Sequence, residues 1–163
     1  MAAILVALCV AWLFMTLLFE RHLERRLQAD MTRDALSLVA DLSFAADGSP
    51  LLEAEPGDPR LRKPAGGYYW QVSTGNGVLR SRSLWDADLE ASRTPPASDW
   101  QLRRAQGPFQ QPVAILERKL QLETDVPAGV VQLAQDTRPL ASARAEFGKE
   151  LAIFLAALWL VLS

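Results

Sequence analysis

An uncharged apolar segment at the N-terminus constrains this chain more than any other feature. Residues 2–19 contain no charged side chain, and a helix of that length spans roughly 27 Å, enough for one crossing of the hydrocarbon core. A cleavable signal peptide would carry basic residues before the apolar run and a small-residue cleavage site after it. Neither is present, because Met1 precedes the run directly and Glu-Arg-His-Leu-Glu-Arg-Arg follows it. We therefore expect an uncleaved transmembrane helix at residues 1–19.

A second apolar segment closes the sequence. Residues 151–162 read LAIFLAALWLVL, and Ser163 is the last residue. As a helix this run reaches only about 18 Å, which is too short to cross the bilayer. Yet it is apolar on every side, whereas a surface helix retains a polar face. We expect an incomplete second transmembrane helix at residues 151–163, preceded by a juxtamembrane helix at residues 138–150, in a chain that continues beyond Ser163.

The charged residues all lie between Glu20 and Glu150, and the net charge is −2. Neither nucleic acid nor an anionic membrane surface is therefore an electrostatic partner. Cys9, the only cysteine, lies in the first apolar run, so the polar domain forms no disulfide and fits a periplasm or a cytoplasm equally well. The basic residues after the first run would place residues 20–26 in the cytoplasm. Basic residues upstream of Met1 could reverse that orientation, and we expect such upstream residues to exist.

Residues 20–46 predict a helix that continues out of the membrane. Its apolar residues recur at spacings of three and four and form one stripe: Leu23, Leu27, Met31, Ala35, Leu38 and Leu42. One interpretation is that the stripe packs on the sheet of the same chain. The other is that its membrane-proximal part, with Leu23, Leu27 and Met31, pairs with the same helix of a second subunit as a short coiled coil. Both can hold at different depths.

Residues 47–137 predict an antiparallel sheet with loops. Four prolines and four glycines between Asp47 and Gly67 exclude a regular element there. The turn residues Thr74-Gly75-Asn76-Gly77 lie between two extended segments and predict a β-hairpin. The expected strands are Tyr68–Ser73, Val78–Ser83, Val113–Glu123 and Val130–Gln135, and further loops are expected at Ser92–Ser98 and Thr124–Gly129. The predicted fold class is α+β, with four or five antiparallel strands.

The aromatic and basic residues of this hairpin are the candidate ligand site. Trp70 and Trp85 flank the hairpin, and as large aromatic side chains we expect both in the core. Arg80 and Arg82 are two residues apart, so they share one face of an extended segment. Two guanidinium groups on one face could hold a carboxylate or phosphate, and Tyr69 would complete a small-anion pocket with them. The alternative is a solvated edge, or an internal pair with Asp86.

The sequence gives less support for catalysis or metal binding than for a small-anion site. Neither of its two acidic clusters has the spacing of a dedicated metal loop; they are Asp86, Asp88 and Glu90, and Glu53, Glu55 and Asp58. We assign no metal site and no catalytic residue. The single histidine, His22, adjoins the first apolar run and is expected to be an interfacial polar residue.

Several stretches together resemble the sensor region of a group of bacterial two-component sensor histidine kinases. They are Glu20-Arg21-His22, Asp58-Pro59-Arg60, Gly67-Tyr68-Tyr69-Trp70-Gln71-Val72, Gly77-Val78-Leu79-Arg80-Ser81-Arg82-Ser83-Leu84-Trp85-Asp86 and Ala134-Gln135-Asp136. The resemblance covers nearly the whole chain, and its Tyr-Trp-Gln and Arg-Ser-Arg-Ser-Leu-Trp-Asp stretches are the most distinctive.

The resemblance implies a homodimer in the bacterial inner membrane with a PAS-like periplasmic sensor sheet. The signal would then be a small molecule or protein of the periplasm. The candidate residues for binding it, from the hairpin pattern above, are Tyr69, Arg80, Arg82 and Asp86. The resemblance also implies a kinase domain after Ser163 that uses ATP with Mg and phosphorylates a cytoplasmic response regulator. Two alternatives stay open from the residues alone. The same sensor could serve a chemoreceptor or a cyclic-dinucleotide cyclase, or the chain could be an envelope protein with a periplasmic binding domain.

Overall fold

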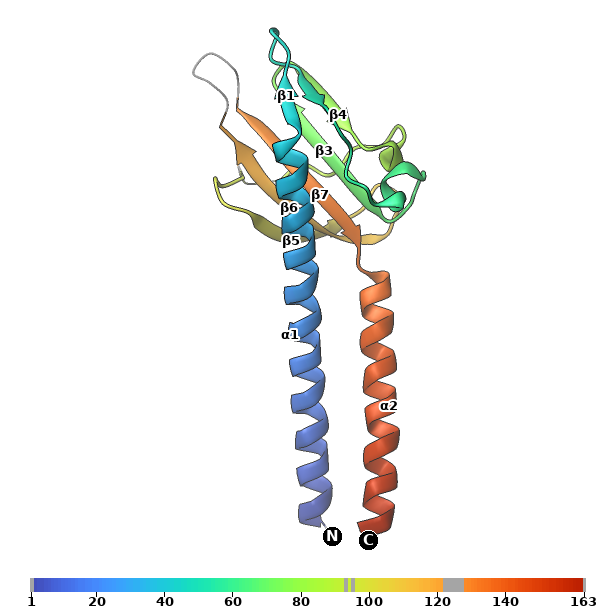
Figure 1. Ribbon diagram of the computed structural model, residues 1–163. Coiled ribbons are helices and arrows are strands. Elements are labelled where there is room, and N and C mark those ends of the chain that lie inside the picture. Colours follow the sequence, from blue (N-terminus) through green and yellow to red (C-terminus); the bar gives the residue numbers. More distant parts are fainter. Residues whose placement is uncertain (1, 93, 95, 122–127, 163) are drawn as a thin grey trace. The chain divides into compact units, whose positions relative to one another are not determined.

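The computed structural model describes residues 2–162 except 93, 95 and 122–127, and it has an α+β fold (Figure 1). In chain order the elements are α1 (Ala2–Ala40), β1 (Leu42–Phe44), β2 (Pro50–Leu52), the 3-10 helix η1 (Pro59–Arg62), β3 (Tyr68–Thr74), β4 (Gly77–Arg80), the 3-10 helix η2 (Arg82–Leu84), β5 (Gln101–Gln106), β6 (Pro112–Leu120), β7 (Gly129–Asp136) and α2 (Arg138–Leu162). They form two compact units, one of residues 1–27 with 138–163 and one of Gln28–Thr137.

The second unit is built on a five-stranded antiparallel sheet of order β4-β3-β7-β6-β5. The hairpin prediction is confirmed, because β3 pairs with β4 and the closing pair is Thr74 with Gly77. The last strand is confirmed as β7, which lies between β3 and β6 at the centre of the sheet. Leu116 and Leu120 are four residues apart in β6 and therefore lie on the same face, as predicted. Leu122, the end of that predicted strand and most of the predicted turn at Thr124–Gly129 lie outside the described residues.

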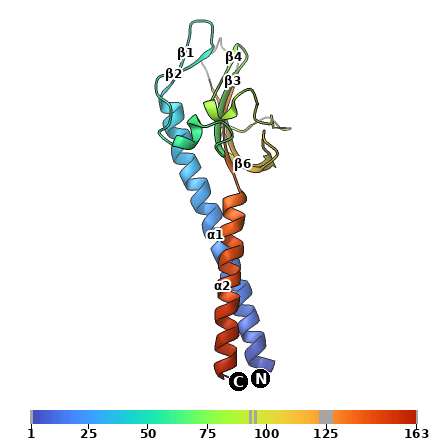
Figure 2. The same ribbon diagram turned by 90° about the vertical axis from the view of Figure 1, so that its right-hand side faces the viewer.

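One face of the sheet packs against the end of α1. Met31, Ala35 and Leu38 are fully buried and lie on one side of α1, since they are spaced by four and three residues. The Tyr68 hydroxyl donates to Asp34 of α1 at 2.8 Å, so the face of β3 that carries Tyr68 and Trp70 is the one toward the helix. Figure 2 shows this end of α1 on one side of the strands. The interpretation that the stripe packs on its own sheet is therefore confirmed for this part.

The opposite face of the sheet holds a second cluster of buried side chains. Its members are Tyr69, Leu84, Leu89, Val113, Ile115 and Ala134. Because the central strands are covered on both faces, the burial of β3 runs unbroken from Tyr68 to Val72 where a one-sided sheet would alternate.

Four element boundaries differ from the sequence prediction. The helix expected to reach residue 46 ends at Ala40, because Leu42–Phe44 pairs with Pro50–Leu52 as a two-stranded sheet. The segment Asp47–Gly67, predicted to lack regular structure, contains β2 and η1. Proline is compatible with both elements. Pro50 is the first residue of β2, an edge strand of the two-stranded sheet, and Pro59 is the first residue of η1.

The other two differences concern strands. The extended segment Val78–Ser83 ends at Arg80 and continues as η2, and β5 was not predicted at all. Residues 92–98 carry no helix or strand where they are described, in line with the predicted loop, but Arg93 and Pro95 of that loop lie outside the described residues.

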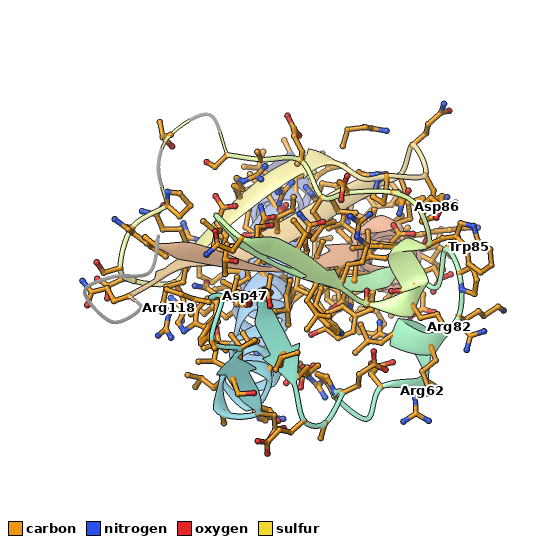
Figure 3. The ribbon with its side chains drawn as sticks, turned by 90° about the horizontal axis from the view of Figure 1, so that it is seen from above. Asp47, Arg62, Arg82, Trp85, Asp86 and Arg118 are labelled. Carbon is orange, nitrogen blue, oxygen red and sulfur yellow. The ribbon has the colours of Figure 1, made fainter. Side chains whose placement is uncertain are left out.

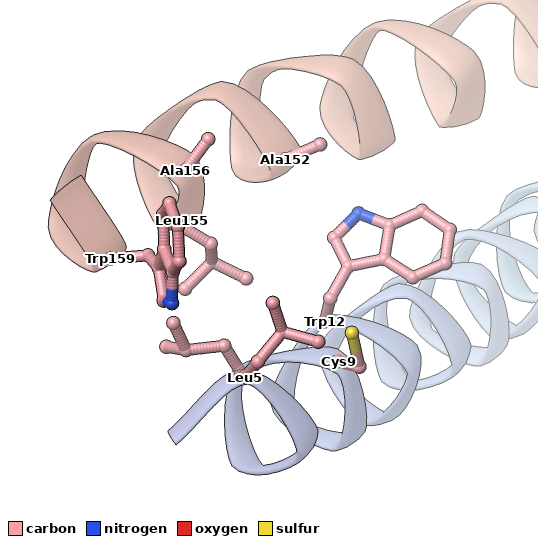
Figure 4. Close-up of a pocket in the computed structure, with 8 residues that line it drawn as sticks. Leu5, Cys9, Trp12, Ala152, Leu155, Ala156 and Trp159 are labelled. Carbon is pink, nitrogen blue, oxygen red and sulfur yellow. The ribbon is translucent and has the colours of Figure 1, made fainter. Parts of the chain in front are cut away.

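The first unit is a pair of antiparallel helices. The Trp12 indole donates to the Gly148 carbonyl at 3.0 Å, Phe19 stacks on Phe147 with 4.0 Å between ring centroids, and Glu20 pairs with Arg144. Residues of both helices also line an open apolar pocket of about 340 Å³. Its labelled lining includes Leu5 and Cys9 of α1 and Trp159 of α2 (Figure 4).

Among the described helices, α1 alone is long and apolar enough to cross a membrane, by length and composition. The predicted juxtamembrane helix and the apolar run that follows it form one continuous helix, α2. Whether α2 also crosses a membrane stays a prediction.

Candidate functional site

The structure brings three of the four predicted ligand residues to one surface recess. Arg80, Ser81, Arg82, Trp85 and Asp86 line a recess of about 350 Å³ at the end of β4. Figure 3 shows Arg82, Trp85 and Asp86 on the same side of the domain. The alternation of a straight strand does not produce this arrangement, because β4 ends at Arg80 and Arg82 already belongs to η2.

Two serines explain why the chain leaves the sheet here and still stays attached to it. The Ser81 amide donates to the Trp70 carbonyl at 2.9 Å, and the Ser81 hydroxyl accepts from the Trp70 amide at 3.1 Å. Ser83 donates to the Tyr68 carbonyl at 2.7 Å. Both serines are buried. These hydroxyls take the place of the backbone hydrogen bonds that a longer β4 would form with β3. Because the serines point toward the sheet, Arg82 between them and Arg80 before them face outward.

Trp85 follows this segment in a backbone conformation that tryptophan rarely adopts. Its φ is +54° and its ψ is −117°, values of the first central residue of a type II′ turn, where glycine is preferred. The Ala87 amide closes the turn by donating to the Leu84 carbonyl at 2.9 Å. Trp85 was expected in the core and that prediction is wrong, since 60% of it is exposed. Trp70 was expected in the core and is buried there.

The charged side chains that line the recess differ in whether they have a partner within the protein. Arg80 is occupied within the protein, because it pairs with Asp88 at 3.0 Å and donates to the Ala87 carbonyl at 3.3 Å. Its internal partner is thus Asp88, where the sequence suggested Asp86. Arg82 and Asp86 are exposed, and neither side chain has a hydrogen-bond or ion-pair partner among the described residues.

Tyr69 does not belong to this recess. It is buried in the cluster opposite α1, its hydroxyl accepts from the Gln111 amide group at 2.7 Å, and the Gly67 amide donates to the same oxygen at 3.2 Å. The expected small-anion pocket of Arg80, Arg82 and Tyr69 is therefore not formed as predicted. Tyr69 instead holds the loop before β3 and the start of β6 together.

A buried polar network was missed by sequence reasoning. Residues 85–90, the covering segment, lie over the sheet face opposite α1. Gln71 accepts from the Leu89 amide at 3.1 Å, and Gln132 donates to the Glu90 carbonyl at 3.2 Å and to Glu117 at 2.9 Å. Arg103 donates to Glu117 at 3.1 Å and also to the Glu90 carbonyl. Glu117 is almost fully buried; Arg103 supplies the opposite charge, and Gln132 donates a hydrogen bond to the other carboxylate oxygen.

The contributing residues come from four different strands and from the loop, which is why no local pattern reveals them. The only sequence signal is a set of polar residues at positions that otherwise alternate into the core: Gln71, Glu117 and Gln132. The network fixes the covering segment, and with it the position of Trp85 and Asp86.

A second polar chain joins α1 to the sheet. Tyr68 donates to Asp34, the Arg60 guanidinium lies 4.8 Å from the Tyr68 ring centroid, and Arg60 pairs with Asp58 at 2.6 Å. Burial, the hydrogen bond to Asp34 and the negative charge of that carboxylate strongly raise the pKa of Tyr68. The hydrogen bond from Arg60 holds the pKa of Asp58 below its usual range.

The residues predicted for a dimer contact divide between the two units. Met31 is fully buried within this chain, so its side chain is not available at a subunit surface. Leu23 and Leu27 are half-buried and belong to the first unit.

The geometry can bind a small polar ligand at the recess and can hold the sheet to α1 at Tyr68. No family model, curated protein or solved structure matches this chain, so the recess is assigned from its own contacts.

Proposed function

We propose that this chain is the sensory and transmembrane region of a bacterial two-component sensor histidine kinase. The sheet of Gln28–Thr137 is a PAS-like sensor domain in the periplasm, α1 and α2 cross the inner membrane, and the working unit is a homodimer. A periplasmic small molecule or protein supplies the signal. A kinase domain beyond Ser163 uses ATP with Mg and passes the phosphoryl group to a cytoplasmic response regulator.

The continuity of the helices with the sheet is the observation that carries this proposal. α1 is one unbroken helix from Ala2 to Ala40, so its apolar segment and its sheet-packed residues belong to the same helix. At the other end, Thr137 alone separates β7 from α2. No flexible linker of glycine or serine lies at either junction.

Such a connection transmits small displacements. A ligand that changes how the sheet packs on Met31, Ala35 and Leu38 would move α1 along or about its axis. Packed interfaces typically shift by about 1–2 Å in such transitions, and a continuous helix carries that shift along its whole length. The Tyr68–Asp34 hydrogen bond couples strand β3 to the same helix.

The native reading frame beyond codon 163 tests the proposal first. The expected result is that α2 is completed as a membrane-spanning helix and followed by a His-Glu-x-x-x-Pro segment and an Asp-x-Gly-x-Gly motif. The full-length protein in lipid nanodiscs should then transfer phosphate from ATP to that histidine, and a His→Gln variant should not. A frame that ends within about twenty codons, the length that completes one crossing, would replace the kinase with an envelope-binding protein. A methyl-accepting or cyclase domain in that place would keep the sensor and change its output.

A further inference from the structure

The recess at the end of β4 presents two opposite charges that do not neutralise each other. Arg82 and Asp86 both line it, yet no ion pair joins them, and neither side chain has another partner among the described residues. Arg80, the third charge of the lining, is already paired with Asp88. The charges left for a ligand are therefore one guanidinium and one carboxylate.

An aromatic ring lies between these charges in the sequence and shares the recess with them. Trp85 is held there from both sides, because the buried Leu84 precedes it and the buried Leu89 follows it. Arg80 adds two bonds to the same segment, one to Ala87 and one to Asp88. The fold thus keeps an exposed tryptophan in a left-handed conformation that costs of order 1–3 kcal/mol. Packing does not account for this, since most of the side chain remains in solvent.

Backbone strain that the surroundings maintain is concentrated at binding sites and switches. A tryptophan face binds apolar groups by stacking and cations by the attraction of its π-system. The indole N–H of Trp85 is a further hydrogen-bond donor among the residues that line the recess.

We propose that this recess binds a small zwitterion of the size of a free α-amino acid. Arg82 receives the carboxylate, Asp86 receives the ammonium group, and Trp85 covers the apolar part of the ligand. The recess of about 350 Å³ lies at the lower end of the range of roughly 300–1,000 Å³ that small-molecule sites occupy. This inference rests on the proposed sensory function and names the class of its signal.

The carboxylate of Asp86 is the reason to prefer a zwitterion to a simple anion. An anionic ligand on Arg82 would place its charge in the same recess as Asp86 and would be repelled by it. A ligand that carries both charges can form a charge-assisted hydrogen bond with Arg82 and another with Asp86.

Isothermal titration calorimetry on the full chain in lipid nanodiscs tests the proposal. The probes are the proteinogenic amino acids, added first as a mixture and then singly, up to about 10 mM so that a Kd near 1 mM is detected. For the amino acid that binds best, the N-acetyl derivative lacks the ammonium group and the carboxamide derivative lacks the carboxylate. Each should bind at least about tenfold more weakly, as expected for the loss of one charged hydrogen-bonding group.

Three variants assign the contacts. Asp86→Asn keeps the side-chain shape and removes the charge, and Arg82→Gln replaces the guanidinium with a shorter neutral amide; each should weaken binding by about tenfold or more. Arg62→Gln is the matched control, because Arg62 is an exposed arginine of η1 with no partner among the described residues and does not line the recess. Its affinity should equal that of the wild type.

Two results would overturn the inference. One is that no amino acid produces a binding heat with a wild-type chain whose circular dichroism shows the folded domain. The other is that the N-acetyl derivative binds as well as the parent, which would identify a plain anion site. Either result leaves the kinase proposal standing, because that proposal is tested by the reading frame and by phosphate transfer.

Discussion

At the scale of single residues, the backbone of Trp85 stores strain that glycine would relieve. We predict that Trp85→Gly makes the domain more stable than Trp85→Ala by about 1 kcal/mol, because alanine keeps the unfavourable φ of +54° and glycine adopts it freely. The free energy of unfolding is measured by native-state hydrogen exchange of β7 amides in the full chain in nanodiscs. Both variants lose the same exposed ring, so their difference isolates the backbone. Equal stabilities would show that the turn relaxes when the ring is removed.

A second residue-scale prediction concerns glycines in the loop before β3. A Cβ on Gly66 would lie 2.1 Å from the Arg60 carbonyl oxygen and 2.8 Å from that of Lys63, whereas a Cβ on Gly57 meets nothing within 4 Å. Gly66→Ala should therefore cost more than about 1 kcal/mol, since backbone atoms must move. Gly57→Ala should leave the stability unchanged or slightly higher. The same hydrogen-exchange measurement compares them, and equal effects would contradict the close approach.

The recess shows how far sequence reasoning reaches at this scale. Arg80, Arg82 and Asp86 were predicted from residue type and spacing, and the structure places all three in its lining. Tyr69 was wrongly included and Trp85 wrongly assigned to the core. Both errors come from expecting an extended chain through Ser83. In the structure the side chains of Ser81 and Ser83 form hydrogen bonds with backbone groups of β3, and the chain turns into η2 instead. Such side-chain pairing with a distant strand leaves no local pattern.

At the scale of elements, α1 carries a matched pair of leucines that measures its packing on the sheet. Leu38 is fully buried, while Leu36 on the same helix is 51% exposed. We predict that Leu38→Ala lowers the free energy of unfolding by about 2–5 kcal/mol, and that Leu36→Ala changes it by less than about 0.5 kcal/mol. Hydrogen exchange of β3 and β7 amides reports both. Comparable losses would mean that the helix does not present this face to the sheet.

The burial of Tyr68 and its hydrogen bond to Asp34 of α1 give the domain an alkaline pH dependence. The pKa of Tyr68 is raised in the folded state above its unfolded value of about 10. Above that pH the unfolded chain binds fewer protons than the folded one, so stability is complete below pH 10 and falls as the pH rises. Tyr68→Phe should be less stable than the wild type at pH 8, and the gap should narrow toward pH 11. A gap that stays constant over that range would refute the assignment.

Each element that could be predicted has a local signal in the sequence. α1 has an apolar stripe at helical spacing, the hairpin of β3 and β4 has turn residues between two extended segments, and β7 begins with residues that favour strands. β5 reads QLRRAQ and lies at the edge of the sheet, mostly exposed. Edge strands are often charged to prevent further pairing, so the property that suits β5 to its place also removes its sequence signal. β2 is three residues long within a proline-rich segment, and its pairing with β1 sets the end of α1.

At the scale of the whole molecule, the proposed function depends on α1 behaving as one rod from Ala2 to Ala40. Gln28 is the residue where the two compact units meet along it. Proline there would remove a backbone donor and clash with the preceding turn, at a cost of about 3 kcal/mol or more. We predict that Gln28→Pro bends or frays the helix at this point, while Gln28→Ala leaves it intact.

Spin labels measure this directly, because Cys9 is the single cysteine and is exposed. A second label at Leu36→Cys, an exposed position, is 27 residues further along, and a continuous helix separates the two by about 40 Å. The wild-type background and Gln28→Ala should give a narrow distance distribution near that value, and Gln28→Pro a broader one at shorter distance. A broad distribution without the proline would mean that α1 does not transmit displacement, because a hinge between the units would absorb a shift of ~1–2 Å before it reached the apolar segment.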